Sequence, residues 1–267
     1  MSILVNKESK VLIQGITGTQ ASFHVKRSMD YGTNVVAGVT PGKGGSVHLD
    51  VPVFDTVREA IGETGANASV MYVPAKFVKD AVREAAEAEL DLCVCIADGV
   101  PIKDMLEIKE MLRGAKTKLI GPNTPGIITP GEARLGIFPE NIHRPGRIGV
   151  VSRSSTLTYE AVIETNRAGL GQSTVIGLGD DMLIGIDFVE TLEKFMNDPD
   201  TDAVVVIVSE ETGTISVAIS GMLKRHLAPQ TLEKLLLNEL APQREEKTRN
   251  PLKLLRRKQK ENKDAKK

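Results

Sequence analysis

A segment near the N-terminus combines glycines and hydroxyl side chains at a spacing that can bind an anion. Residues 14–21 read QGITGTQA and directly follow the apolar run Val11 to Gln14, which is typical of a strand. Where a strand turns into a helix, unpaired backbone amides point outward and stabilise negative charge. The Gly-x-x-Gly spacing is not the dinucleotide fingerprint, so an ordinary strand-to-helix turn remains an alternative.

Two further loops follow predicted strands and carry charged residues. Lys43 lies in residues 40–45 (TPGKGG), after a second apolar run, and Asp98 lies in residues 96–101 (IADGVP), after a later one. The carboxyl ends of parallel strands meet at one edge of a sheet, where open α/β sheets bind their ligands. We therefore expect the glycine segment, Lys43 and Asp98 to line one crevice that suits a phosphate. The alternative for Lys43 is a solvated loop lysine.

The elements that would position these loops alternate regularly. Short β-branched runs predict parallel strands at 11–14, 34–39, 69–73, 92–96 and 118–120. Apolar spacing of three and four, with a proline near each start, predicts helices at 75–89 and 102–113. Strand followed by helix, repeated, predicts a doubly wound α/β domain over residues 1–125.

Turn-forming residues then predict a linker at 126–146 and a second α/β unit at 147–222. Its expected strands are 148–152, 173–177 and 203–208, with helices at 156–168 and 186–196. Three strands make only part of a domain and leave an open edge, so we expect a partner to cover it. After Gly221 the sequence predicts no further strand, and residues 223–267 are expected to form a basic helical or disordered tail.

Charge is distributed unevenly along the chain. Residues 224–267 carry 14 Lys/Arg against 6 Asp/Glu, whereas the remainder carries 20 against 29. A basic block is more often a solvated helix or tail than a nucleic-acid or partner-binding arm. Because no aromatic residues are interleaved with the basic ones, we expect no nucleic-acid partner.

Composition bounds the class of protein. Hydrophobic residues at 41% and charged residues at 26% indicate a globular protein rather than a disordered or membrane one. Cys93 and Cys95 are the only cysteines, and we expect them not to bridge, which favours a reducing compartment. No leader, transit segment or apolar run of membrane length is evident, so we expect a cytoplasmic protein. No metal site is expected.

Several of these segments resemble the alpha subunits of the succinate–CoA ligase (succinyl-CoA synthetase) family. The resemblance runs from Met1 to about Gly213 and is carried by residues 15–18 (GITG), 38–45 (GVTPGKGG), 72–74 (YVP), 121–123 (GPN), 129–132 (TPGE) and 152–154 (SRS). It implies a Rossmann-like CoA-binding domain followed by a flavodoxin-like domain, here incomplete. It also implies a beta-type partner subunit that holds the Mg-nucleoside triphosphate, so that the two subunits form a heteromer.

The resemblance assigns roles to individual residues. Coenzyme A would be held by the glycine segment, the lysine loop and the loop after the fourth strand, that is by Thr17, Gly18, Thr19, Gln20, Lys43, Ile96, Ala97 and Asp98. Tyr159 would face succinate, although its place in the first turns of a helix is, on sequence alone, more typical of packing. Phosphate would meet Ser154, Ser155 and Thr156, where the family usually has glycine in place of Ser155.

One part of the family pattern is missing. The family transfers phosphate through a histidine in a Gly-His-Ala-Gly loop, and this chain has no such loop. Its histidines are His24, His48, His143 and His226, and the last lies in a stretch that we interpret as helical, which does not suit a phosphoacceptor. Glu210 could match the carboxylate that orients the missing histidine, but an exposed acidic loop is the stronger interpretation.

Two functions therefore stay open. The first is an alpha-type ligase subunit, acting on succinate, CoA and ATP or GTP, that retains CoA binding but lacks the phosphohistidine of the family, through truncation, a frameshift after about Gly213 or divergence. The second is a noncatalytic CoA-binding or regulatory subunit.

Overall fold

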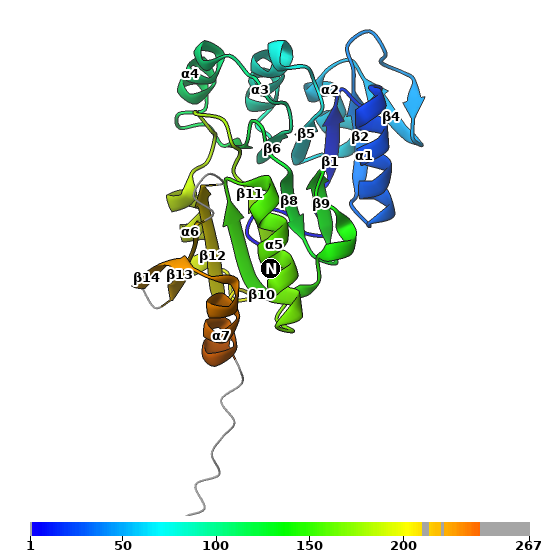
Figure 1. Cartoon of the computed structure of the whole chain (residues 1–267). Coiled ribbons are helices and arrows are strands. Elements are labelled where there is room, and N and C mark those ends of the chain that lie inside the picture. The colour runs from blue at the N-terminus through cyan, green and yellow to red at the C-terminus, as the bar shows by residue number, and fades with distance from the viewer. Residues whose placement is uncertain (1, 210–213, 220–221, 241–267) are drawn as a thin grey trace, which may run out of the picture.

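The computed structural model describes residues 2–209, 214–219 and 222–240. Two seven-stranded sheets lie one above the other, the first in the upper half of Figure 1 and the second in the lower half. The first sheet has the strand order β3-β4-β2-β1-β5-β6-β7, and the second has β14-β13-β12-β10-β11-β8-β9. The chain crosses from one sheet to the other between β7 and β8.

The first sheet confirms the alternation of strands and helices predicted from the sequence. Its strands are β1 (Val11–Gln14), β2 (Val35–Val39), β3 (Val47–His48), β4 (Val51–Phe54), β5 (Ala68–Met71), β6 (Leu92–Cys95) and β7 (Lys118–Ile120). Across the sheet, in the spatial order β4-β2-β1-β5-β6-β7, all neighbouring strands pair in parallel. The helices of this half are α1 (Thr19–Asp30), α2 (Val57–Thr64), the 3₁₀ turn η1 (Ala75–Phe77), α3 (Val78–Glu87) and α4 (Ile102–Met111).

The second sheet is larger than the three expected strands. Its strands are β8 (Gly126–Thr129), β9 (Ala133–Gly136), β10 (Pro145–Ser152), β11 (Gln172–Gly177), β12 (Ala203–Ser209), β13 (Thr214–Ile219) and β14 (Met222–Leu227). Its helices are η2 (Glu140–Ile142), a 3₁₀ turn, and α5 (Ser155–Arg167), α6 (Phe188–Met196) and α7 (Pro229–Leu240). Strands β8 and β9 lie within residues 126–146, the stretch expected to be a linker.

The prediction that no strand follows Gly221 was wrong. Residues 222–227 form β14, which pairs with β13, and β13 pairs with β12. His226 therefore lies in a strand, with a φ of 56°, rather than in a helix. Leu232, Leu235, Leu236 and Leu240 have the spacing of a helix, and the helical prediction based on them was extended too far toward the N-terminus. The helix begins only at Pro229, where the fixed φ of proline suits a first helical position. Residues 241–267 lie outside the described residues.

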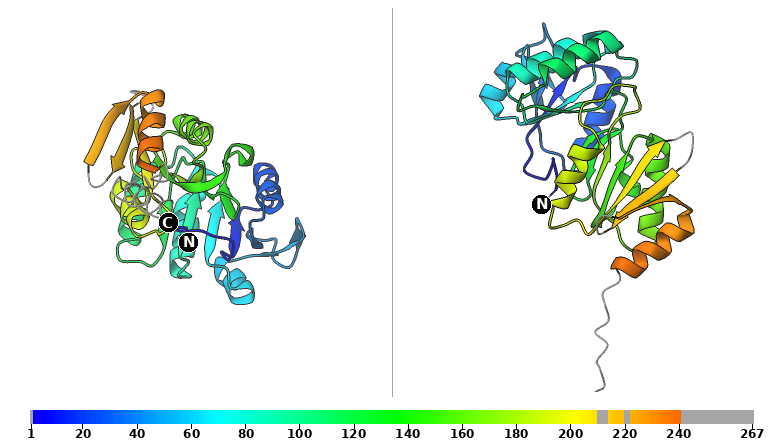
Figure 2. Two further views of the ribbon diagram at one scale, coloured as in Figure 1. Left: turned by 90° about the horizontal axis from the view of Figure 1, so that it is seen from below. Right: turned by 90° about the vertical axis from the view of Figure 1, so that its left-hand side faces the viewer.

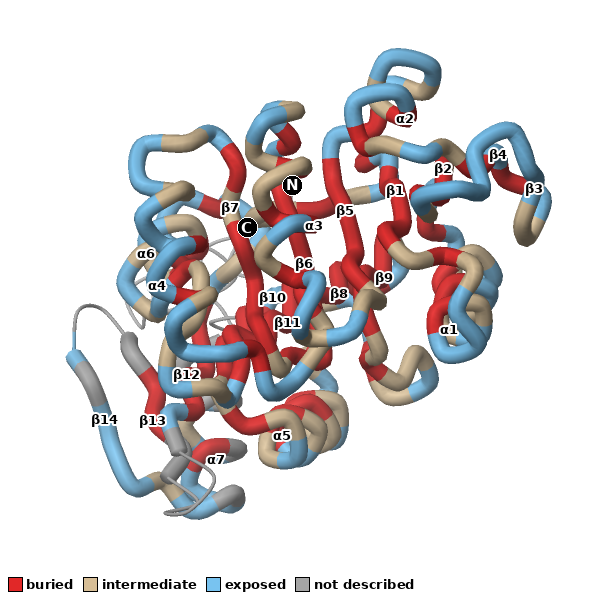
Figure 3. The backbone as a smooth tube through the Cα atoms, turned by 90° about the horizontal axis from the view of Figure 1, so that it is seen from above, coloured by how far each residue is buried: buried red, intermediate tan, exposed pale blue. Residues whose placement is uncertain are grey.

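Three apolar clusters divide the core into layers. The middle cluster contains side chains from both sheets, among them Ile13 and Val70 of the first and Val151 and Val206 of the second. The outer face of the first sheet packs against α2, α3 and α4, and that of the second sheet against α5 and α7. Figure 2 shows the helices on these outer faces, and Figure 3 shows that most buried residues follow the strands. The two sheets thus share one core.

Arg134 of β9 is a buried charge that ties the second sheet to α1. Its side chain is 1% exposed, and its guanidinium donates to Phe138 O at 2.5 Å, to His24 O at 3.2 Å and to Ser28 Oγ at 2.8 Å. Its backbone amide donates to the Thr33 hydroxyl, which lies just after α1. A desolvated guanidinium is stable only when its donors are paired, so these acceptors hold α1 in place.

We expect Arg134→Met to lower the free energy of unfolding by about 3 kcal/mol, because it leaves several buried acceptors without a donor. Urea unfolding followed by circular dichroism measures the change. The matched control is Arg113→Met, because Arg113 pairs with Glu110 at the surface, with side chains 78% and 67% exposed. That control should change the stability by less than about 0.5 kcal/mol. Equal effects of the two substitutions would contradict the role of Arg134.

His143 is a second buried polar group in the segment between β9 and β10. Its ring is 7% exposed, lies edge-on to Phe138 and donates from Nδ1 to Pro139 O at 2.7 Å. Burial lowers the pKa of His143 from 6.5 to about 4. The folded protein therefore holds this imidazole neutral at pH values where the unfolded chain would protonate it.

This difference predicts a loss of stability in mild acid. Between pH 6.5 and about 4 the unfolded state binds more protons than the folded state at His143, so stability falls as the pH falls. From pH 7 to pH 4 we expect the wild type to lose about 3 kcal/mol more than His143→Gln, whose amide can still donate to Pro139 O. Urea unfolding at four pH values measures both curves. Parallel curves would show that His143 is not the group responsible.

Candidate functional site

The structure brings the three predicted loops to one edge of the first sheet. The glycine segment follows β1, the lysine loop follows β2, and residues 96–98 follow β6. These strands run parallel in the order β2-β1-β5-β6, so their carboxyl ends are neighbours. Gly18, Thr19, Gln20, Lys43 and Asp98 are exposed. Thr17, Ile96 and Ala97 are half-buried.

The two glycines of the first loop have different tasks. Gly15 has a φ of +82°, and a Cβ on it would lie 2.8 Å from Tyr72 O, so only glycine fits there. Gly18 has an ordinary φ of −73°, and a Cβ on it would come no closer than 3.4 Å to another part of the chain. Gly15 is therefore required by the fold, whereas the space in front of Gly18 is open to a ligand.

The N-terminus of α1 lies at the centre of this edge. Gly18 is its N-cap, no side chain caps the helix, and the first turn carries no acidic residue. The first amides of α1 therefore keep their donors for an outside acceptor, and the helix dipole favours an anion. Lys43 adds a positive charge beside these amides, since its Nζ donates to Thr17 Oγ1 at 3.2 Å, just before the helix begins. Thr17 Oγ1 in turn lies 3.4 Å from Thr40 Oγ1.

The loop after β6 forms the other side of the crevice. Ala97 O accepts a hydrogen bond of 2.7 Å from Asn123 N, so the chain that leaves the first sheet braces this loop. The side-chain amide of Asn123 donates from Nδ2 to the Asp181 carboxylate at 3.0 Å, which ties the same point to the second half of the molecule. The backbone of residues 96–98 is thus fixed, while the side chain of Asp98 faces solvent.

The second predicted anion site, at the start of α5, is arranged differently. Ser154 is 1% exposed and caps the helix by accepting from Leu157 N at 3.2 Å. Ser155 is half-buried and Thr156 is exposed, so both are reachable. Tyr159 lies one turn after Ser155 and hence on the same face of α5. Its half-buried ring packs edge-on to Phe138 at 6.0 Å, as the packing interpretation predicted.

The remaining titratable candidates do not gather at either site. Glu210 lies outside the described residues. His24 is half-buried, and its ring stacks on that of Tyr72 at 6.1 Å. His48 is bonded to Ser22 at 2.7 Å, beside the glycine segment, and His226 is exposed on β14. Within the described ranges no cluster of three or more His, Cys, Asp or Glu side chains is arranged to bind a metal ion.

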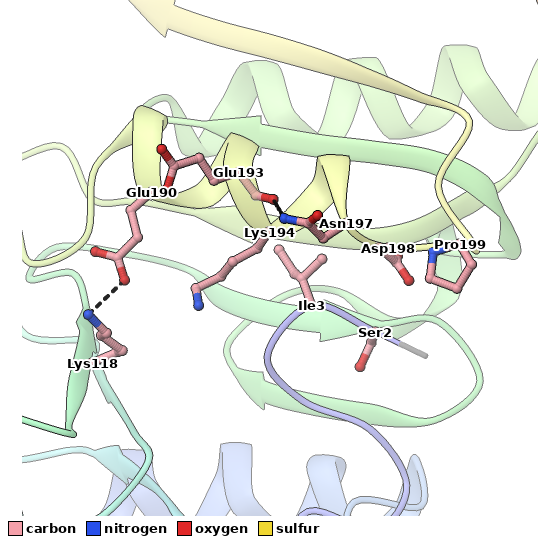
Figure 4. Close-up of a pocket in the computed structure, with 9 residues that line it drawn as sticks. All are labelled: Ser2, Ile3, Lys118, Glu190, Glu193, Lys194, Asn197, Asp198 and Pro199. Carbon is pink, nitrogen blue, oxygen red and sulfur yellow. Dashed lines mark hydrogen bonds and ion pairs between the residues drawn. The ribbon is translucent and has the colours of Figure 1, made fainter.

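A groove of about 690 Å³ lies away from all of these residues. It is lined by Ser2 and Ile3, by Lys118 of β7 and by α6 with the residues after it (Figure 4). Its walls mix both charges, and Lys118 is already paired with Glu190 at 3.0 Å. With three carboxylates against two lysines in its lining, the groove offers no excess positive charge to a phosphate, and we place the candidate site at the edge of the first sheet instead. No helix among the described residues is long and apolar enough to cross a membrane.

Family models match two parts of the chain. A CoA binding domain matches residues 6–99, which contain the glycine segment and the lysine loop, and a CoA-ligase domain matches residues 151–234. The second match passes Gly213, where the sequence-based resemblance was expected to end, and includes β13 and β14.

Solved structures with the same fold include two larger enzymes. The chain of ATP citrate lyase from Methanothrix soehngenii matches with a TM-score of 0.68 and 21% identity, over 76% of this chain and 36% of that one. The dinucleotide forming acetyl-coenzyme A synthetase 1 of Ca. Korarchaeum cryptofilum matches with a TM-score of 0.64 and 18% identity, over 75% of this chain and 44% of that one. At such identities the likeness concerns the fold alone.

Curated relatives are much more similar in sequence. The alpha subunit of succinate–CoA ligase [ADP-forming] from Staphylococcus epidermidis is 50% identical over 227 residues, 85% of this chain and 75% of the relative. The corresponding Staphylococcus aureus subunit is 53% identical over 207 residues, 78% of this chain and 68% of the relative. With its CoA-binding and CoA-ligase domains in this order, the chain belongs to the family of succinate–CoA ligase alpha subunits.

Proposed function

We propose that the phosphates of coenzyme A bind at the carboxyl edge of the first sheet, between the N-terminus of α1 and Lys43. The observation that carries this proposal is the uncapped start of α1, beside which Lys43 Nζ donates to the Thr17 hydroxyl at 3.2 Å. Thr17 to Gln20 would bind phosphate oxygens through amides and hydroxyls, and Ile96 to Asp98 would line the opposite wall. An adjacent cation lets the site hold a doubly charged pyrophosphate.

The chemistry of the family extends this proposal to a second subunit. The overall reaction joins succinate to the thiol of coenzyme A and splits ATP or GTP into the diphosphate and phosphate. In the proposed assembly a beta-type subunit holds the Mg-nucleotide, and succinate lies near Tyr159 of this chain. A phosphate group would then lie at the start of α5, against Ser155 and Thr156. Ser154, whose side chain already caps the helix, would hold the backbone of this site in place.

The positions of the four histidines argue against phosphoryl transfer by the present chain. A phosphoacceptor needs an accessible imidazole nitrogen beside the phosphate site. His143 is buried with one nitrogen bonded to Pro139 O, and His48 is bonded to Ser22. His24 is half-buried against Tyr72. His226 lies in strand β14, whereas the family carries its phosphoacceptor on a loop. The second candidate function, a noncatalytic CoA-binding or regulatory subunit, rests on this observation.

Calorimetry with the full chain tests CoA binding. We expect Lys43→Ala to weaken CoA binding about tenfold, because it removes a cation from the phosphates. Gly18→Val should weaken binding at least as much, since its side chain fills the space in front of the α1 amides. Lys43→Ala should keep the wild-type melting temperature, because Lys43 is exposed. Gly18→Val should fold, because Gly18 has an ordinary φ, but should melt a few degrees lower, since valine is a weaker N-cap than glycine.

The matched control for Lys43→Ala is Lys103→Ala, which removes an exposed lysine on α4 and should leave the affinity unchanged. If Lys43→Ala and Gly18→Val both bind CoA as the wild type does, the assigned site is wrong. Binding of a nicotinamide dinucleotide in place of CoA would favour an oxidoreductase instead.

Labelling with γ-³²P nucleotide tests the catalytic step. Incubated with a beta-type subunit, succinate, CoA and ATP or GTP, the 267-residue chain should bind CoA yet carry no acid-labile, base-stable phosphate. The reason is that helix N-termini stabilise a phosphoryl group without supplying a nucleophile that accepts and releases it. Label on this chain that disappears in His226→Asn would overturn this expectation and restore the ligase mechanism.

A further inference from the structure

Besides the bond from Lys43 to Thr17, a second hydrogen bond joins the lysine loop to α1, and no sequence pattern predicts it. After β2 the chain runs through Lys43, forms the short strand β3 and returns along β4. At the end of β3, His48 Nε2 lies 2.7 Å from Ser22 Oγ, in the first turns of α1. Ser22 and His48 are 26 residues apart in sequence, and neither belongs to the predicted CoA contacts.

The hydroxyl of Ser22 gives this contact a direction. Ser22 Oγ also lies 2.9 Å from Gly18 O and 3.3 Å from Ile16 O, and both carbonyl oxygens can only accept. A hydroxyl has a single proton, so we assign that proton to the nearer carbonyl, Gly18 O, and assign His48 Nε2 as the donor to Ser22. The hydrogen bonds therefore run from His48 to Ser22 and on to the carbonyl of Gly18, the N-cap of α1. Ser22 is thus not set up as a nucleophile, because a histidine that donates to it cannot take its proton.

Little else holds this part of the loop against α1. Val47, the other residue of β3, is 70% exposed, so apolar burial contributes little there. Gly44 N bonds to Asp55 Oδ1 and Gly45 N to Val53 O, both at 2.9 Å, and these contacts tie the loop to β4 and the residue after it. Among the side-chain hydrogen bonds of the described residues, those that link the loop to α1 and the glycine segment involve Thr40, Lys43 and His48, and the Thr40 contact to Thr17 is the longest at 3.4 Å.

The turn after His48 has a strained backbone, which fixes the position of His48. Leu49 and Asp50 connect β3 to β4 with φ values of 52° and 62°, in the left-handed region that a leucine rarely adopts. Such a conformation persists only where the surroundings determine it. Leu49 packs against the shared core, and the pairing of His48 with Val51 fixes the register of β3. The strained turn therefore aims His48 at Ser22.

A bound ligand would affect the Lys43–Thr17 bond but not the His48–Ser22 bond. A phosphate bound by Lys43 would compete with the Thr17 hydroxyl for its ammonium group, so that bond changes when the site fills. The His48–Ser22 bond uses no group assigned to the ligand and can persist throughout. We propose that this bond is a brace that holds the lysine loop against the α1 N-terminus, which makes His48 a positioning residue for CoA binding. The inference rests on the proposed CoA site.

Calorimetry with CoA on the full chain tests the brace. His48→Ala and Ser22→Ala should each weaken CoA binding about tenfold, and the double variant no more than either single one, because both remove the same bond. His48→Gln, whose side-chain amide can donate to Ser22, should stay within about threefold of the wild type. In a Lys43→Ala background, His48→Ala should have no further effect, because the brace acts by placing Lys43.

The matched control is Val47→Ala, which changes the neighbouring exposed residue of β3 and should leave the affinity unchanged. Ser22→Ala covers the case in which His48→Ala fails to fold, because alanine favours the helix at that position. Hydrogen exchange of the free protein adds a readout that needs no ligand. The amides of residues 43–46 should exchange faster in His48→Ala and Ser22→Ala, but not in His48→Gln.

Three results would overturn the brace: unchanged affinity in both alanine variants, additive losses in the double variant, or an undiminished loss in the Lys43→Ala background. These results are distinguishable from failure of the CoA site itself. If the wild type does not bind CoA, the proposed function fails, and unchanged exchange in residues 43–46 would then reject the brace separately. Normal CoA binding that depends on Lys43 but not on His48 rejects the brace alone.

Discussion

The buried guanidinium of Arg134 is the constraint on which the arrangement of the two sheets depends. Removing a guanidinium from water is unfavourable unless polar groups replace the solvent, and here two carbonyls and a hydroxyl do so. Two of these acceptors belong to α1, and the third follows β9. The second sheet can therefore move relative to α1 only by leaving a buried charge unpaired. Because α1 carries the candidate anion site at its other end, the second sheet fixes the helix that would bind the ligand.

Helix α1 and the lysine loop beside it are consequently held by different kinds of force. At α1, apolar packing and the Arg134 network fix the backbone, and the close approach of Gly15 to Tyr72 O leaves no room for adjustment. The lysine loop, by contrast, is largely exposed and depends on a few hydrogen bonds. An exposed loop held by a few bonds can adjust to a flexible ligand such as CoA, whereas a packed helix gives the phosphates a fixed position.

Local patterns in the sequence were sufficient for five of the seven strands of the first sheet, whereas the short strands β3 and β4 and helix α2 were not predicted. Buried parallel strands such as Val11–Gln14 appear as short β-branched runs, and the loops after them were assigned to one edge by a general rule of parallel sheets. The second half depended on long-range pairing. The sequence 214–219 (TISVAI) alternates as a strand should, but whether it joins a sheet is decided by β12 and β14 on either side. The bond between Ser22 and His48 could not be predicted, because no local pattern links a helical serine to a histidine beyond a loop.

A comparison of the two helix N-termini indicates where an outside anion matters most. At α5, Ser154 supplies the cap from within the chain, so the helix start is satisfied without a ligand. At α1 the N-cap is Gly18, which has no side chain to offer, and the Ser22 hydroxyl, which bonds to it, donates to its carbonyl. Helix amides without a cap are stabilised by water or by a ligand. The chain thus completes the start of α5 by itself, whereas the start of α1, beside Lys43, keeps backbone donors that an outside anion can use.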